Sequence, residues 1–211
     1  MNLGNYKIAK QVLEKSLEIH KKQLGEKHIY SAYIKYDLAR VYIKLNQFDQ
    51  AEKLYEQSLL MCGKHYGQSH AEYAQILCDF GFSFFLQKNF IKAEQLLSQA
   101  LKILEEKKHD EIYRCYEYLG DLYAKKNQKN KANMYYGKAL NYLKKHFPKD
   151  STHIKRLTTK FSLMQQCLIS IKELTAKVVR ECSSKLGLEG ESNFRLNCDP
   201  YRRPSCAVHN K

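Results

Sequence analysis

Residues 46–61 read NQFDQAEKLYEQSLLM, with small residues at Ala51 and Ser58 and the bulky Tyr55 between them. Three further stretches repeat this pattern: GNYKIAKQVLEKSLEI at 4–19, KNFIKAEQLLSQALKI at 88–103 and NQKNKANMYYGKALNY at 127–142. The shared alanine recurs at intervals of 42, 42 and 39 residues, at Ala9, Ala51, Ala93 and Ala132. A repeat of this length predicts a stacked solenoid, because each unit buries its apolar face only against its neighbours. We therefore expect a binding surface rather than a catalytic centre.

Each full unit contains two amphipathic helical segments that are joined by a short polar break. In residues 30–45, apolar side chains follow one another at spacings of three or four, which is the pattern of one helix face. The break at Asn46-Gln47 leads into a second segment, which ends near the helix-stopping residues Gly63 and Gly67. Because the whole chain holds only 9 Gly and 3 Pro, this pattern predicts an all-α fold.

The repeats divide the chain into an array and a C-terminal extension. We expect the array over residues 1–147, with a half-repeat at 1–28 and full repeats at about 29–70, 71–109 and 110–147. A long capping helix is expected over 150–187, followed by a disordered tail at 188–211, where the sequence shows no periodicity. The long helix carries a heptad-like apolar seam: Ile154, Leu157, Phe161, Met164, Leu168, Ile171, Val178 and Cys182. Either this seam covers the last repeat, or its distal half pairs with a second copy in a homodimer.

The chain carries a net charge of +14, and the excess lies in its second half. Residues 115–187 hold 15 Lys and Arg against 5 Asp and Glu, whereas residues 1–114 hold 17 against 14. A positive field of this kind favours acidic partners, whether protein, nucleic acid or anionic membrane. A solvated lysine-rich surface without any such partner is the simpler interpretation.

The cysteines and the N-terminal sequence bear on the compartment. None of the 7 cysteines forms a CxxC pair, and five of them fall within predicted helices: Cys62, Cys78, Cys115, Cys167 and Cys182. We expect these five to be small buried hydrophobic residues in a reducing compartment. The sequence shows no signal segment and no apolar run of membrane-spanning length. These features predict a soluble, cytoplasmic protein.

The predicted helices share a set of packing residues. In the first helix of each unit, a large and a small residue are followed by an aromatic one: Leu38-Ala39 with Tyr42, Phe80-Gly81 with Phe84, and Leu119-Gly120 with Tyr123. In the second helix a bulky residue lies between two small ones: Ala51, Tyr55 and Ser58; Ala93, Leu97 and Ala100; Ala132, Tyr136 and Ala139. This arrangement resembles the tetratricopeptide repeat (TPR). The 42-residue period and the Leu24-Gly25…His28 and Tyr66-Gly67…His70 junctions resemble the kinesin-light-chain type of array. The resemblance implies a right-handed superhelix of helix-turn-helix repeats.

The resemblance also implies a binding site, because the first helices of such arrays line a concave groove that receives a partner segment. Helical geometry places these side chains in the groove: Tyr33, Tyr36, Arg40, Lys44, Gln75, Cys78, Phe82, Phe85, Arg114, Glu117, Asp121 and Lys125. Aromatic and arginine side chains are typical binding anchors. For Phe82 and Phe85, burial in the core is an equal alternative. Kinesin-light-chain arrays carry Asn just before the large–small pair, where this chain has Tyr36-Asp37, Cys78-Asp79 and Glu117-Tyr118.

No pattern in the sequence indicates chemistry. An HExxH motif, a phosphate-binding glycine loop and a GxSxG motif are absent. Cys62, His65 and His70 are close in sequence, but without a second cysteine pair they do not predict a metal site. We expect no cofactor and no metal.

These observations predict a non-enzymatic adaptor that binds an acidic protein or peptide in the groove, with a kinesin-light-chain-like cargo adaptor as one form. The alternative is electrostatic binding of nucleic acid or an anionic membrane through the basic face of residues 115–187. Nucleic acid is the less favoured partner, since the sequence has no recognised nucleic-acid-reading motif.

Overall fold

Helices make up the regular structure of residues 3–185, the part of the chain that the computed structural model describes. In order they are α1 (Leu3–Leu24), α2 (Ile29–Lys44), α3 (Phe48–Tyr66), α4 (Ala71–Leu86), α5 (Phe90–Lys107), α6 (Ile112–Lys125), α7 (Lys129–His146) and α8 (Thr152–Lys185). This order confirms the expected all-α fold. The tail predicted at 188–211 lies outside the described residues, as does the side chain of Cys182.

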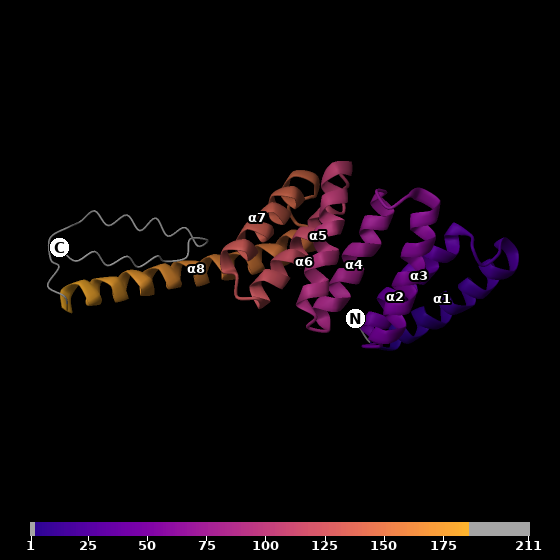
Figure 1. Cartoon of the computed structure of the whole chain (residues 1–211), viewed down its shortest axis with the longest axis horizontal. Coiled ribbons are helices and arrows are strands. Elements are labelled where there is room, and N and C mark those ends of the chain that lie inside the picture. The colour runs from indigo at the N-terminus through magenta and orange to yellow at the C-terminus, as the bar shows by residue number, and fades with distance from the viewer. Residues whose placement is uncertain (1–2, 186–211) are drawn as a thin grey trace, which may run out of the picture. The chain divides into compact units, whose positions relative to one another are not determined.

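Neighbouring helices pack as hairpins that stack in chain order (Figure 1). The pairs α2–α3, α4–α5 and α6–α7 make the most extensive contacts, and α3 packs on α4 and α5 on α6. Helix α1 packs against α2 without a first helix of its own among the described residues. The first helices α2, α4 and α6 also contact one another, so they form a continuous row along the solenoid.

The turn inside each pair is set by one residue in the left-handed backbone region. Asn46, Lys88 and Asn127 occupy equivalent places with φ of 58°, 62° and 58°. Asn adopts this region more easily than other L-residues, because its short side chain hydrogen-bonds locally. The polar break seen in the sequence therefore marks the residue that reverses the chain.

A histidine begins the first helix of each repeat. His28 Nδ1 accepts a hydrogen bond from the Tyr30 backbone N–H at 3.3 Å, and His70 Nδ1 accepts one from Glu72 N–H at 3.3 Å. In the shorter third junction, His109 Nδ1 accepts a hydrogen bond from Glu111 N–H at 3.2 Å, although the Gly-x-x-His sequence is missing there. His28 and His70 cap unpaired N–H groups at a helix start, whereas His109 bonds the N–H of Glu111, the residue just before α6.

The hydrophobic core depends on small residues where helices cross. Ala51, Ala93 and Ala132 are fully buried. In α6, a Cβ atom on Gly120 would lie 2.5 Å from the ring of Tyr136 on α7, well inside van der Waals contact. The phenol of Tyr136 donates a hydrogen bond to Asp121 Oδ1 at 2.6 Å, so the ring is held in place from its far end.

We predict that Gly120→Ala lowers the free energy of unfolding by about 2 kcal/mol, because it overpacks a buried contact. Gly4→Ala is the matched control: a Cβ atom there meets nothing within 4 Å, and alanine favours a helix. Urea unfolding followed by circular dichroism measures both changes. Equal stability of the Gly120→Ala variant and the parent protein would contradict this account of the helix crossing.

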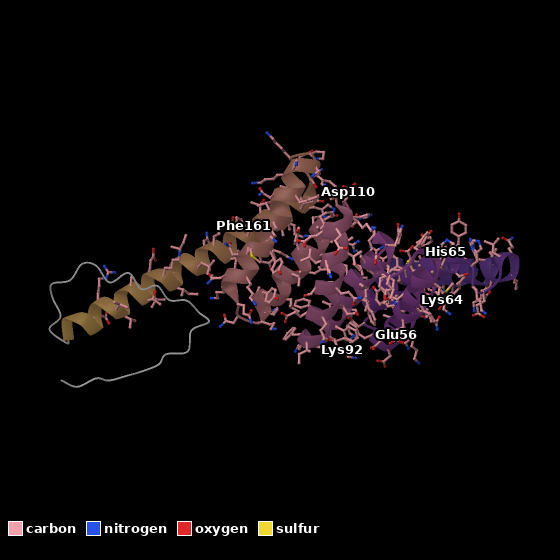
Figure 2. The ribbon with its side chains drawn as sticks, turned by 45° about the horizontal axis from the view of Figure 1, so that its top comes forward. Glu56, Lys64, His65, Lys92, Asp110 and Phe161 are labelled. Carbon is pink, nitrogen blue, oxygen red and sulfur yellow. The ribbon has the colours of Figure 1, made fainter. Side chains whose placement is uncertain are left out.

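Helix α8 packs on the array along its first half. The array and this half, up to Leu168, form one compact unit. Ile154 and Leu157 are buried in the core, and Phe161 and Met164 pack partly against it. Phe161 (labelled in Figure 2) reaches Gly137 of α7, where a Cβ atom would lie 3.4 Å from its ring. The proximal seam is therefore a packing surface for the last repeat.

The cysteines separate into two groups. Cys62, Cys78 and Cys115 are buried, as expected, and burial raises the pKa of the Cys62 thiol to about 11. Cys167 is exposed, so the prediction of burial was wrong for it. Cys167 comes after Phe161 and Met164, the part of α8 that is only partly buried. It is the neighbour of the seam residue Leu168 and is not itself part of the seam. Of the helices within residues 3–185, none has the length and apolarity that crossing a membrane requires.

Candidate partner-binding groove

A groove of about 470 Å³ lies along the row of first helices. Six of the predicted site residues line it: Arg40 and Lys44 from α2, Phe82 from α4, and Arg114, Glu117 and Asp121 from α6. Their side chains come together because the first helices lie side by side and present equivalent faces to the same side.

The far wall of the groove comes from α8, which the sequence analysis did not include. His153, Arg156 and Lys160 line the groove from this helix. Arg156 pairs with Glu117 at 2.7 Å, and Lys160 pairs with Glu117 at 2.9 Å and with Asp121 at 2.8 Å. The first half of α8 therefore takes the place that the first helix of a further repeat would occupy. The spacing of residues 153, 156 and 160 beside the apolar seam is the signal that marks this basic face.

The floor of the groove is built around Asp79, which is only 5% exposed. The Tyr36 hydroxyl donates a hydrogen bond to Asp79 Oδ2 at 2.7 Å, and Arg40 Nε lies 3.3 Å from the same oxygen. Arg114 and, at 3.4 Å, the Tyr118 hydroxyl contact the other oxygen, Oδ1. A buried carboxylate is stable only with such partners, since desolvation of an unpaired charge is very unfavourable.

An aromatic platform adjoins this buried carboxylate. The rings of Phe82 and Tyr118 stack with centroids 4.1 Å apart and an interplanar angle of 15°. Phe82 is half-buried and lines the groove, whereas Phe85 packs against the core behind it. Of the two alternatives left open by the sequence, a place in the groove therefore applies to Phe82, and packing against the core applies to Phe85. A flat, rigid ring surface beside arginine side chains suits the binding of an apolar side chain.

The family model of the tetratricopeptide repeat matches residues 1–64, 36–106 and 72–145. The chain belongs to the tetratricopeptide repeat family. This fold is typically that of a non-enzymatic interaction scaffold.

Solved structures of other TPR proteins share the fold of this array. BtubC (BKLC) from P. vanneervenii superposes with a TM-score of 0.67 at 17% identity, over 99% of this chain and 82% of that chain. A putative kinesin light chain of Podosopora anserina, with nearly identical TPR-like repeats, gives a TM-score of 0.63 at 18% identity, over 87% and 89% of the two chains. The apo form of RapI gives 0.59 at 18% identity, over 87% and 71%. A comparison with curated proteins finds no match. These likenesses show that the array shares its solenoid fold with these proteins.

The other predicted site residues lie outside the groove of this TPR protein. The Tyr33 hydroxyl contacts the Tyr66 hydroxyl at 2.9 Å, and Gln75 contacts His109 at 3.4 Å. Cys78 is buried in the core, because its face of α4 turns towards the neighbouring helices. Lys125 is exposed at the end of α6, beyond the groove lining. Tyr36 is half-buried and is not part of the groove lining, but its hydroxyl bonds Asp79 and its ring lies 5.5 Å from the guanidinium of Arg40.

The groove combines fixed charges with protonated phenols. Burial and the neighbouring Asp79 carboxylate raise the pKa of both Tyr36 and Tyr118 above the ordinary range, so both phenols remain hydrogen-bond donors at neutral pH. Burial acts to lower the pKa of Lys160, but its contacts with Asp121 and Glu117 outweigh that effect and raise it. Among the described residues, no three His, Cys, Asp or Glu side chains are grouped to hold a metal ion.

We predict that Asp79→Ala lowers the free energy of unfolding by about 3 kcal/mol, because it leaves the half-buried Tyr36 hydroxyl without its acceptor and leaves Arg114 with Glu111 as its remaining carboxylate partner. The control is Asp37→Ala, at the equivalent position of the preceding repeat. The side chain of Asp37 is 51% exposed, and within residues 3–185 it pairs only with Arg40, so its removal is expected to change stability by less than about 0.5 kcal/mol. Urea unfolding distinguishes the two variants, and similar losses from both would contradict the role given to Asp79.

Proposed function

We propose that this TPR protein is a non-enzymatic adaptor that holds an acidic segment of a partner protein in the groove. The observation that carries the proposal is the open row of cations beside the Phe82–Tyr118 platform. The side chains of Arg40 and Arg156 are 48% and 55% exposed while they pair with buried carboxylates. Lys44 is exposed and has no carboxylate within 4.0 Å among the described residues. An acidic segment would meet these cations at the rim and place an apolar side chain on the platform.

A kinesin-light-chain-like cargo adaptor is the form of this function that the architecture favours. The support is the likeness of the array to the putative kinesin light chain structure. The groove nevertheless has its own chemistry, because Asp79 stands where such arrays carry Asn and draws Arg40 and Arg114 towards the floor. We therefore propose a partner peptide that differs from known cargo peptides. The free thiols of Cys62, Cys78 and Cys115 suit a reducing compartment, so we propose the cytoplasm.

The groove is tested with peptides selected from a random display library on the full chain. We expect the selected peptides to be acidic with at least one apolar anchor. Lys44→Ala should weaken binding about 3-fold to 10-fold, and Phe82→Ala about 10-fold or more, since anchors at interface centres dominate affinity. Lys125→Ala is the matched control, because Lys125 ends α6 as Lys44 ends α2 but lies outside the groove lining. Fluorescence anisotropy measures each Kd, and equal effects of the two lysine variants would reject the groove as the binding site.

The competing proposal is electrostatic binding of nucleic acid or an anionic membrane through residues 115–187. The charge of this region favours it, with 15 basic against 5 acidic residues. Part of that charge is already used inside the protein, since Arg156, Lys160 and Lys126 pair with carboxylates of the array. Binding to single-stranded DNA or anionic vesicles that falls steeply with salt, and that Lys44→Ala leaves unchanged, would favour this alternative.

We also propose that the distal half of α8 pairs two copies of the protein. Beyond Leu168 the apolar side chains are exposed, with Ile171 at 40%, Leu174 at 62% and Val178 at 53%. Sedimentation equilibrium should show a dimer that dissociates in an Ile171→Asp and Val178→Asp double variant, because a charge in an apolar seam opposes helix pairing. The control is Lys172→Asp, which changes an exposed lysine of the same helix; this variant should remain dimeric. A monomer at every concentration of the parent protein would refute the pairing.

A further inference from the structure

A second hollow, with a volume of about 390 Å³, lies away from the groove between the α1–α2 junction, α2 and α3. It is lined by the side chain of Lys35 on α2 and by residues of the last turns of α3. Two of the lining residues, Lys64 and His65, are labelled in Figure 2. Lys35 directly precedes Tyr36, so it leaves α2 about 100° around the helix from the groove-facing row. The two sites are therefore on different faces of the same helix.

Lys35 is a buried cation without a counter-ion. The residue is only 6% exposed, and among the described residues its ammonium donates only to the thioether sulfur of Met61, at 3.8 Å. Glu26 also lines the hollow, but its carboxylate pairs with Lys21 at 2.8 Å. No carboxylate within the described residues lies within 4.0 Å of the Lys35 ammonium. A thioether is a weak acceptor, so the desolvation of this charge is offset only in part, by the more distant Glu26 carboxylate.

The electrostatic surroundings of Lys35 are those of an anion site. Burial lowers the pKa of Lys35, and the nearby Lys21 lowers it further, while Glu26 acts in the opposite direction. Lys27 and Lys64 add two more ammonium groups to the lining, and His65 adds an imidazole. An anion bound among these groups would supply the missing counter-charge to Lys35. A doubly charged anion matches three ammonium groups better than a single carboxylate does.

The other residues that line the pocket indicate what kind of group the bound anion is attached to. Leu60 and Met61 give the hollow an apolar side, and Leu60 is 60% exposed. The volume falls within the range of small-molecule sites, which are mostly apolar with a few placed polar groups. The site therefore suits a ligand that joins a compact dianion to an apolar body.

We propose that this pocket binds a phosphate monoester, with the Lys35 ammonium as its buried counter-ion and Leu60 and Met61 against its apolar part. Lysine is a common phosphate ligand as a point charge. The phosphate belongs either to a small molecule or to a phosphorylated side chain, and both sources present the same group to the pocket. This proposal uses no residue of the groove, so it stands or falls independently of the adaptor function.

Isothermal titration of the full chain with phenyl phosphate and with a short phosphoserine peptide tests the proposal. We expect saturable binding of at least one of them, with affinity at least 10-fold lower in Lys35→Met. Lys53→Met is the matched control: Lys53 is an exposed lysine of α3 outside the lining, so its loss should leave the affinity unchanged. Preference for phenyl phosphate would assign a small molecule, and preference for the peptide would assign a phosphorylated protein.

The unliganded variants provide a second measurement. Because methionine replaces an unpaired buried ammonium with an apolar chain of similar length, Lys35→Met should melt at the same temperature as the parent protein or higher. Lys64→Met keeps Lys35 in place and should weaken phenyl phosphate or peptide binding several-fold, so it tests the pocket even if Lys35→Met fails to fold. Absence of saturable binding of either phosphate, or equal binding by the parent protein and Lys35→Met, would overturn the proposal.

Discussion

Close approach of the two helices in each repeat is the constraint on which the structure depends. A small residue on one helix faces a bulky one on the other, and Gly120 against Tyr136 is the tightest case. Only at this separation do the second helices cover the back of the first helices, which leaves the front of α2, α4 and α6 as one row. The groove is a consequence of that row, since its lining comes from equivalent faces of consecutive helices.

Ion pairs and hydrogen bonds stabilise the groove in addition to side-chain packing. Asp79 on α4 gathers side chains from two other helices: Tyr36 and Arg40 from α2, and Arg114 and Tyr118 from α6. Such a network has a double effect, because it ties neighbouring repeats together and fixes the orientation of the arginines that a partner would meet. The pairs of Arg156 and Lys160 with Glu117 and Asp121 do the same at the other end of the groove.

The sequence predicted the helices and much of the groove, because both follow from local spacing. The repeat positions placed Arg40, Phe82 and Arg114 on one side of the array, since a helix has a fixed period, and the structure brings these three side chains together in one lining. The same reasoning placed Cys78 and Lys125 at the site, and it could not see that one is buried by neighbouring helices and the other lies beyond the lining. It missed α8 as a wall because helix 152–185 lies outside the repeat pattern. It also missed the burial of Lys35, because burial of a lysine depends on how α1 and α3 enclose α2.

Because the first half of α8 both ends the stack and supplies one wall of the groove, the array is not freely modular. In most solenoids a repeat can be inserted or removed with little effect beyond its neighbours. Here an extra hairpin between α7 and α8 would carry Arg156 and Lys160 away from α6 and leave Glu117, which is 3% exposed, without its cations. The last repeat and the first half of α8 are therefore matched to each other by charge, so a change of the helix that follows the array would also require a change in the acidic residues of α6.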